Sequence, residues 1–359
     1  MNWPLHGSNP KYIYESLHLS SPGHVLDFSV NLNPFGPPPS IKEHWESWLD
    51  HIADYPDPKG ERLVELIAEK ERVQKESILL GNGGAELFTL LGQLLAEKRV
   101  VIVQPTFTEY EKICRAHGCH VSFFQLEEGD GWKLHTDLLL EKIKNADALF
   151  VCHPNNPTGT AYPESVLLEI LAACQTHDCF FIVDEAFADF LDENRTLASY
   201  IKHNAHLIIV RSVTKMYAIA GLRLGFLLAS PQVVARLRSF QPYWAVNALA
   251  LLAGEHCLQE EGYAGQTRQW IGRERQRIFE SLWSAGYILS ASKVNFYLLK
   301  DPSLDDQFPL FIFLLKKGIV PRHTMNYPGL EGRWLRFGVR QAKENDILLE
   351  ALWQWKHQR

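Results

Sequence analysis

The sequence predicts an α/β fold in which helices cover both faces of a mostly parallel sheet. From about residue 41 to 240, segments with helical periodicity alternate with short apolar runs. The runs FFIVDEA (180–186), HLIIVRS (206–212) and LGFLLAS (224–230) are nearly continuous in Val, Ile, Leu and Phe. Such runs are typical of strands that are buried on both faces. Because helices and strands alternate along the chain, we expect most strands to pair in parallel.

The elements divide the chain into three parts. Residues 1–40 are rich in Pro, Gly and Asn and predict an N-terminal arm rather than a domain. Residues 41–240 form the predicted large domain, in which ERLVELIAEKERV (61–73) reads as a helix. Residues 241–359 begin with a long helical stretch and then alternate in a different style, which predicts a smaller α+β C-terminal domain.

Composition and charge exclude several classes of function. The net charge is −6 and the pI is about 6.2, so no basic field would attract nucleic acid or anionic lipid. No apolar run is long enough to span a bilayer, and the N-terminus lacks a signal-peptide pattern. The six cysteines form no C-x-x-C pair, and the fifteen histidines form no H-x-x-x-H or H-E-x-x-H pattern. We therefore expect a cytoplasmic protein with reduced thiols, no metal, no membrane partner and no nucleic-acid partner.

Two polar segments follow predicted strands, at the end of the sheet where open α/β folds bind ligands. LLGNGGAELF (79–88) reads as a strand end, a glycine turn and a helix start, and its backbone N–H groups could hold a phosphate. Taken alone, it equally fits an ordinary tight turn. VCHPNNPTG (151–159) ends a strand in a turn, where Asn156 offers a side-chain amide.

Two charged residues stand at positions that favour burial. Asp184 directly follows four apolar residues, and an unpaired buried carboxylate is costly, so a cationic partner is expected. The alternative is that Asp184 caps a helix. Lys215 lies in VRSVTKMYAIAGLRLGF (210–226), and its ammonium either reaches solvent or is a desolvated amine available for covalent chemistry.

The spacing of these residues decides between the alternatives. Asn156 lies 28 residues before Asp184, Asp184 lies 31 before Lys215, and Arg223 lies 8 after Lys215. Ser212 lies three residues before the lysine. In this pattern the chain resembles the fold-type I family of pyridoxal-phosphate (PLP) enzymes, the aspartate aminotransferase superfamily. The resemblance implies a PLP-dependent transferase-like fold and PLP as the cofactor.

The resemblance also implies a role for each residue. Lys215 would bind the cofactor covalently and later move protons, and Asp184 would pair with its ring nitrogen. Asn156 would hydrogen-bond its 3-oxygen. Phe107, in PTFTEY (105–110), would stack on its ring unless it only packs in the core. The residues expected to hold the cofactor phosphate are Gly83, Gly84, Ala85, Ser212, Arg223 and, from a neighbouring subunit, Tyr55.

Two further consequences follow from the resemblance. A shared Tyr55 would make the protein a homodimer with shared active sites. Many aminotransferases have a tyrosine three residues after the aspartate, hydrogen-bonded to the cofactor oxygen, but this chain has Phe187 there. This departure weakens a direct transfer of aminotransferase behaviour to the chain.

Within the superfamily, the chain is most similar to the branch of histidinol-phosphate aminotransferases and L-threonine O-3-phosphate decarboxylases. The segments His6-Gly7, LDFSVNLNPFGPP (26–38) and NYPGLEGRWLRFGVR (326–340) favour the decarboxylases. The resemblance then implies decarboxylation of L-threonine O-3-phosphate to (R)-1-amino-2-propanol O-2-phosphate, the linker piece of cobalamin. The alternative is a histidinol-phosphate or aromatic aminotransferase that uses 2-oxoglutarate. Because the same catalytic residues serve both reactions, the choice rests on the resemblance.

Substrate-binding residues are expected from the arm and the C-terminal domain. Arg336 would hold the substrate carboxylate, with a surface strand position as the alternative. Arg322 would hold the substrate phosphate together with His6, with a loop salt bridge as the alternative for Arg322. Asn31 would lie where the arm approaches the substrate, and Arg340 is an alternative for either anion.

Overall fold

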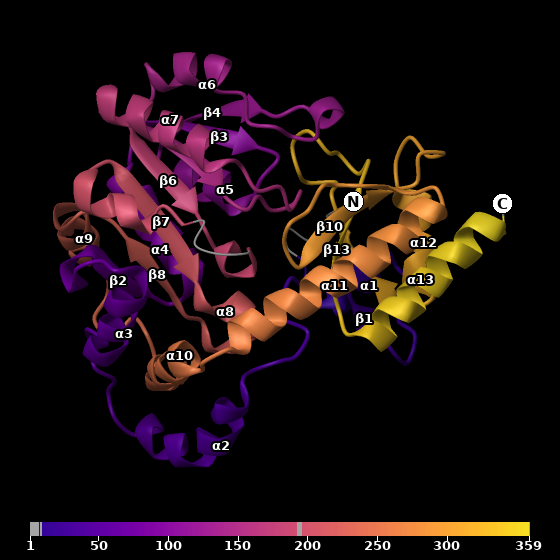
Figure 1. Ribbon diagram of the computed structural model, residues 1–359, viewed down its shortest axis with the longest axis horizontal. Coiled ribbons are helices and arrows are strands. Elements are labelled where there is room, and N and C mark those ends of the chain that lie inside the picture. Colours follow the sequence, from indigo (N-terminus) through magenta and orange to yellow (C-terminus); the bar gives the residue numbers. More distant parts are fainter. Residues whose placement is uncertain (1–6, 8, 192–195, 359) are drawn as a thin grey trace.

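The structure, a computed structural model, describes residue 7 and residues 9–191 and 196–358. A seven-stranded sheet in the order β2-β8-β7-β6-β5-β3-β4 forms the centre of the large lobe (Figure 1). Strands β3 to β7 pair in parallel with one another, whereas β8 runs antiparallel to both β7 and β2. This arrangement confirms the predicted mostly parallel sheet. The strands are β2 (Ile78–Gly81), β3 (Arg99–Gln104), β4 (His120–Gln125), β5 (Ala148–Cys152), β6 (Phe180–Asp184), β7 (Leu207–Ser212) and β8 (Gly225–Leu228).

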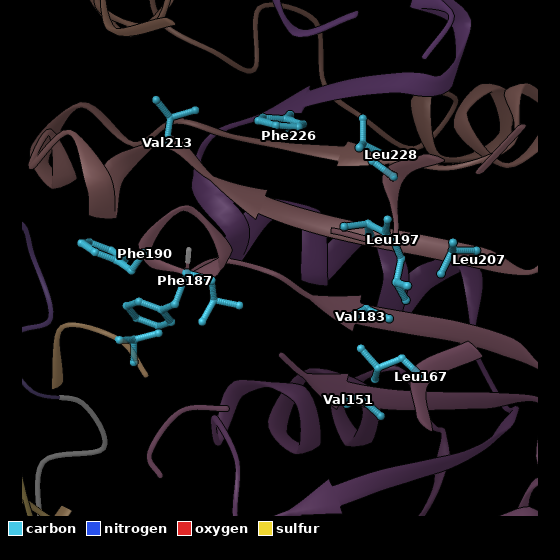
Figure 2. Packing of buried hydrophobic residues seen from close by; sticks show 14 of the residues in the cluster. Val151, Leu167, Val183, Phe187, Phe190, Leu197, Leu207, Val213, Phe226 and Leu228 are labelled. Carbon is cyan, nitrogen blue, oxygen red and sulfur yellow. The ribbon is translucent and has the colours of Figure 1, made fainter. Parts of the chain in front are cut away.

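Both faces of this sheet are buried, which explains its continuous apolar runs. In β7, Leu207 and Ile209 belong to the apolar cluster on one face, whereas Ile208 and Val210 belong to the cluster on the other. Figure 2 shows side chains of the first cluster on neighbouring strands. The helices are α2 (Pro39–Trp48), α3 (Glu61–Glu71), α6 (Thr136–Ile143), α7 (Glu164–Thr176) and α10 (Ala248–Gln259) on the first face, and α4 (Gly83–Leu94), α5 (Glu109–Ala116) and α9 (Pro231–Arg238) on the second.

The small lobe holds an antiparallel sheet in the order β12-β13-β10-β9, with a separate apolar cluster beside it. The long helix α11 leads from the large lobe into it (Figure 1). The elements of the small lobe are α11 (Tyr263–Ser284), β9 (Ile288–Leu289), β10 (Phe296–Lys300), α12 (Phe308–Lys316), β11 (Ile319–Val320), β12 (Arg322–His323), β13 (Leu335–Gly338) and α13 (Ala342–His357).

The N-terminal arm is tied to both lobes. It contains a short helix, α1 (Pro10–Ser16), and the strand β1 (Leu26–Asp27), which pairs in parallel with β11. The hydroxyl of Tyr14 donates to the carbonyl of Leu315 at 2.8 Å, and Phe28 joins the small-lobe core. Farther along, the backbone N–H of Asn33 donates to the backbone carbonyl of Lys215 at 3.0 Å. The arm therefore passes along the small lobe and then reaches the predicted site.

The division into domains stays a prediction, and packing divides the chain somewhat differently. Helix α10 contacts α2 and α3, and Ala250 and Leu251 belong to the apolar cluster of the large lobe. The predicted boundary at residue 240 would assign α10 to the small domain. Hydrophobic periodicity identifies a helix but does not specify which core it covers, and the sequence alone therefore could not place this boundary.

Candidate active site

A cavity of about 680 Å³ lies between the arm, the carboxyl ends of β5, β6 and β7, and the small lobe. Most predicted site residues line this cavity, although they are spread over three hundred positions of the chain. The predicted residues in its wall are Asn31, Gly84, Ala85, Phe107, Asn156, Asp184, Ser212, Lys215, Arg223, Arg322 and Arg336.

Of the predicted residues that the structure describes, three do not line the cavity. Gly83 lies next to it, at the start of α4. Tyr55 is 80% exposed and stacks on Trp244, with 4.4 Å between ring centroids. Arg340 bonds to the carboxylate of Glu344 at 2.8 Å. His6 lies outside the described residues.

Lys215 lies on α8 (Val213–Met216), a single turn that directly follows β7. Burial and, after it, the positive charges of Arg223 and Arg336 lower its pKa to about 8, against the opposing effect of Asp184. An amine with this pKa is partly neutral near physiological pH. Lys215 therefore has the chemistry of a covalent nucleophile and proton carrier.

Asp184 ends β6 and is only 6% exposed. Its Oδ1 accepts the amide of Ala186 at 2.9 Å, and its Oδ2 accepts the hydroxyl of Tyr110 in a short hydrogen bond. Burial raises the pKa of Asp184, whereas the bonds from Tyr110 and Ala186 and the charge of Lys215 lower it. No helix begins at Asp184, since the next helical turn starts at Ala188, so the alternative of a helix cap is wrong.

The turn predicted to hold a phosphate joins β2 to α4, where Asn82 precedes the first helical residue. Gly83 has a φ of +72°, and a Cβ at this position would lie 2.6 Å from Nη2 of Arg223. Glycine therefore allows the guanidinium of Arg223 to approach the N-terminus of α4. Ser212 and Thr214 bond to each other through their hydroxyls at 2.8 Å beside this turn. A helix N-terminus, a guanidinium and hydroxyl groups together form a set of donors suited to a phosphate.

Arg336 lies on β13 and is 5% exposed, so it is not a surface strand residue. It donates to Oδ1 of Asn156 and, at 2.7 Å, to the carbonyl of Ser29. Burial, with a smaller contribution from the charge of Arg322, lowers the pKa of Arg336 to about 10. Arg336 thus joins the small lobe to the strand ends of the large lobe and to the arm.

Arg322 is buried on β12. It contacts Nε2 of His323 at 2.7 Å, donates to Oδ1 of Asn326 at 2.8 Å and lies over the ring of Tyr327. Burial lowers its pKa. Nearby in the wall, the buried Oδ1 of Asn31 has no hydrogen-bond partner among the residues that the structure describes. Cationic and polar groups of the arm and small lobe therefore surround one end of the cavity.

Cations predominate over anions in the cavity wall. Among the described residues of the wall there is one carboxylate, that of Asp184, whereas the cations include Lys215, Arg223, Arg322 and Arg336. A fifth cation that lines the cavity, Arg211, is paired with the carboxylates of Glu185 and Asp189. A site with this balance of charge favours anionic ligands.

The structure adds residues that the sequence did not single out. Thr214, Tyr327 and Ser29 line the cavity, and Tyr110 bonds to Asp184. Thr214 could have been found from its position directly before Lys215. The other three carry no pattern in the sequence, because each is brought to the site from a distant segment.

Two absences hold for the described part of the chain. No group of three or more His, Cys, Asp or Glu in these ranges could hold a metal ion. Among the helices of the same ranges, none is long and apolar enough to cross a membrane.

A partly buried lysine beside a buried aspartate, at the ends of parallel strands, is the type of site expected in the aminotransferase superfamily. The model of the family described as aminotransferase class I and II matches residues 23–352. The chain therefore belongs to the aminotransferase class I and II family.

The chain is similar to individual members of this family. It is 39% identical over 351 residues to a threonine-phosphate decarboxylase of Salmonella typhimurium, which covers 97% of this chain and 95% of the relative. Among solved structures, the histidinol-phosphate aminotransferase of Clostridium acetobutylicum has a TM-score of 0.88 and 29% identity, and it covers 93% of this chain and all of its own. The L-threonine-O-3-phosphate decarboxylase of Porphyromonas gingivalis has a TM-score of 0.82 and 25% identity, with 92% and 99% covered. The shape of the fold therefore does not separate the two activities.

Proposed function

We propose that this chain is a PLP-dependent enzyme that decarboxylates L-threonine O-3-phosphate to (R)-1-amino-2-propanol O-2-phosphate and carbon dioxide. The observation that carries the proposal is the pair of buried guanidinium groups, Arg322 and Arg336, in the same cavity as Lys215. A substrate with one carboxylate and one phosphate offers an anion to each of them. The 39% identity to a threonine-phosphate decarboxylase supports the same substrate. The product would then serve as the linker piece of cobalamin.

The residues present fit the cofactor. The phosphate would be held by the turn at Gly83–Ala85, by Ser212 and by Arg223, where the structure has a helix N-terminus, hydroxyls and a guanidinium. Asp184 would face the ring nitrogen, and Asn156 would face the ring oxygen. Phe107 lines the cavity and would cover one face of the ring. When bound to Lys215, the cofactor supplies an electron sink for the pair of electrons left at the substrate Cα.

The chain's own residues would select the bond that breaks. Arg336 would hold the substrate carboxylate and Arg322 the phosphate, and these two fixed points would set the rotation of the substrate about Cα. Asp184, whose ionised form is favoured by the hydrogen bonds from Tyr110 and Ala186, would balance a positive charge on the ring nitrogen. Lys215, with a pKa of about 8, would deliver a proton to Cα after the carboxylate leaves.

A second candidate is histidinol-phosphate (or aromatic) aminotransferase activity with 2-oxoglutarate. It is supported by the similarity to the Clostridium acetobutylicum enzyme. The same Lys215 would then remove the Cα proton instead of supplying one. Phe187 counts against this candidate, since it gives no hydroxyl at the position where many aminotransferases have tyrosine.

We also propose a homodimer with shared sites. Tyr55 and Tyr243 are largely exposed, and Trp244, whose ring contacts both of theirs, is partly exposed. These three aromatic rings form an exposed group. Exposed aromatic groups are common at subunit interfaces. Tyr55 from a partner subunit would then contact the cofactor phosphate. A cytoplasmic location is consistent with six free, buried cysteines.

The proposed function is tested with the purified protein and PLP. With L-threonine O-3-phosphate alone, we expect stoichiometric release of carbon dioxide and one phosphorylated amine. With histidinol phosphate and 2-oxoglutarate, we expect no glutamate above background. The reverse outcome would establish the aminotransferase, and a colourless protein that binds no PLP would exclude both candidates.

A further inference from the structure

Tyr110 is a buried phenol that none of the roles above uses. It lies in the first turn of α5, three residues after Phe107, and is 1% exposed. Its hydroxyl donates to Oδ2 of Asp184 in a short hydrogen bond. Tyr110 thus contacts Asp184, the residue proposed to face the ring nitrogen of the cofactor.

Packing holds the Tyr110 ring in one place. It stacks on Phe150 of β5, with 5.4 Å between centroids and 24° between planes. Phe88 of α4 covers it at 4.9 Å, and Phe107 meets its edge at 5.6 Å. Since three aromatic rings fix it, the hydroxyl has little freedom to leave Asp184. The same ring supports Phe107, the residue proposed to stack on the cofactor.

Two hydrogen bonds orient the Asp184 carboxylate and favour its ionised form. Its two oxygens each accept one hydrogen bond, from Ala186 and Tyr110. Burial alone would raise the pKa of Asp184 and favour the neutral acid, whereas the phenol donates to the ionised form. Burial, followed by the charge of Asp184, raises the pKa of Tyr110 well above its ordinary value, so the phenol stays a donor.

We propose that Tyr110 is a positioning residue that keeps Asp184 ionised and aimed at the cofactor's ring nitrogen. The proposal rests on the proposed function, since it assumes that Asp184 faces this nitrogen. It concerns a different part of the site from Phe187: the chain lacks a tyrosine hydroxyl at position 187 but places one on Asp184. The protonation of the ring nitrogen would thus be controlled through a hydrogen bond from outside the cavity.

The variant Tyr110→Phe removes the hydroxyl and keeps the ring. We expect the dissociation constant for PLP to rise about tenfold, as for the loss of one hydrogen bond to a charged group. The difference from wild type should grow as the pH falls, because Asp184 then becomes protonated more readily. The other titratable groups around this carboxylate are Lys215 and Cys152. Cys152 loses the hydroxyl as a neighbour in the variant, but burial raises the pKa of its thiol well above the ordinary value, so the thiol stays neutral. In the loaded enzyme, kcat should fall while KM for the substrate stays within about twofold.

A matched control is Tyr287→Phe. Tyr287 is also a buried phenol, but its hydroxyl donates to the carbonyl of Leu352 in the small lobe at 2.9 Å. This variant should lose thermal stability without changing PLP affinity or its pH dependence. Unchanged PLP affinity in Tyr110→Phe across the pH range would overturn the role of Tyr110, although PLP binding and carbon dioxide release by the wild type would stand. Failure of the wild type to bind PLP would instead overturn the proposed function.

Discussion

Lys215 and Asp184 line one cavity, and their removal from water shifts their pKa values in opposite directions. Burial favours the neutral form of each group, so it lowers the pKa of the lysine and raises that of the aspartate. Hydrogen bonds from Tyr110 and Ala186 oppose the effect on Asp184, whereas Arg223 and Arg336 reinforce it on Lys215. The result is an amine that loses its proton more easily than an ordinary lysine, beside a carboxylate whose pKa stays above its ordinary value although these hydrogen bonds oppose the rise.

The pKa of Lys215 predicts how the cofactor-free protein reacts with PLP. Only the neutral amine is a nucleophile, so the rate of covalent attachment should rise with pH up to about 8 and then level off. Stopped-flow absorbance of the yellow complex measures this rate. Lys215→Ala serves as the control and should give no attachment that borohydride can fix. A wild-type rate that keeps rising up to about pH 10 would show that the lysine has its ordinary pKa.

The proposed phosphate site predicts a substrate-dependent effect of Arg322→Gln. The variant should raise KM for L-threonine O-3-phosphate about 100-fold, because a buried anion would lose its charged partner. The low activity expected with unphosphorylated threonine should hardly change. Arg340→Gln is the matched variant outside the cavity wall, where Arg340 bonds to Glu344. A larger rise in KM for Arg340→Gln than for Arg322→Gln would show that Arg340, rather than Arg322, binds the substrate phosphate.

The sequence predicted those site residues that lie at recognisable distances from one another along the chain. Asn156, Asp184, Lys215 and Arg223 each lie at a recognisable distance from the next, and the structure brings all four to one cavity. Their roles stay predictions. Tyr110 escaped notice because its function depends on a contact with a residue 74 positions away.

Among the elements, β6 and β7 are linked to α3 by a buried charge cluster beneath the site. Arg211 of β7 contacts Glu71 of α3, Glu185 after β6 and Asp189, at 3.5, 3.1 and 2.8 Å. All four side chains are mostly or fully shielded from water. This cluster fixes the carboxyl ends of the strands that carry Asp184 and Ser212.

The variant Arg211→Met should destabilise the protein strongly. It leaves three carboxylates without their shared cation, which costs about 3–5 kcal/mol in the free energy of unfolding. The exposed pair Arg62–Glu65 provides a control, since Arg62→Met should cost about 0.5 kcal/mol or less. Chemical denaturation followed by circular dichroism compares them. Equal midpoints for the two variants would contradict the importance of the buried cluster.

The predictability of elements depended on their length and on local pairing. Segments such as 206–212 were predicted as strands because both faces are apolar, and β7 lies there. The two-residue strands β1, β9, β11 and β12 are too short to show any period. The pairing of β1 with β11 joins segments almost three hundred residues apart, which no local pattern records.

For the whole molecule, the active site is assembled from the arm, the large lobe and the small lobe. Ser29 of the arm and Asn156 of the large lobe both bond to Arg336 of the small lobe. Bringing these lobes together also brings the proposed carboxylate and phosphate sites to Lys215. The sequence predicted the two lobes, but the assignment of α10 and the path of the arm required the tertiary structure.

The proposed dimer predicts that two inactive variants restore activity to each other. If Tyr55 acts on the partner's cofactor, a mixed dimer of Tyr55→Ala and Lys215→Ala chains contains one intact site. Random mixing by reversible unfolding should then recover about a quarter of the wild-type activity per chain. Each variant treated alone is the control. A mixture no more active than Tyr55→Ala alone would contradict shared sites.

The central claim is that the carboxylate, rather than the α-hydrogen, leaves the substrate Cα. It is tested most directly with L-threonine O-3-phosphate that carries deuterium at Cα, followed by mass spectrometry of the product. Decarboxylation breaks no Cα–H bond, so we expect 1-amino-2-propanol phosphate to form with the deuterium retained. A keto acid without the deuterium, formed only when 2-oxoglutarate is present, would contradict decarboxylation and identify a transaminase.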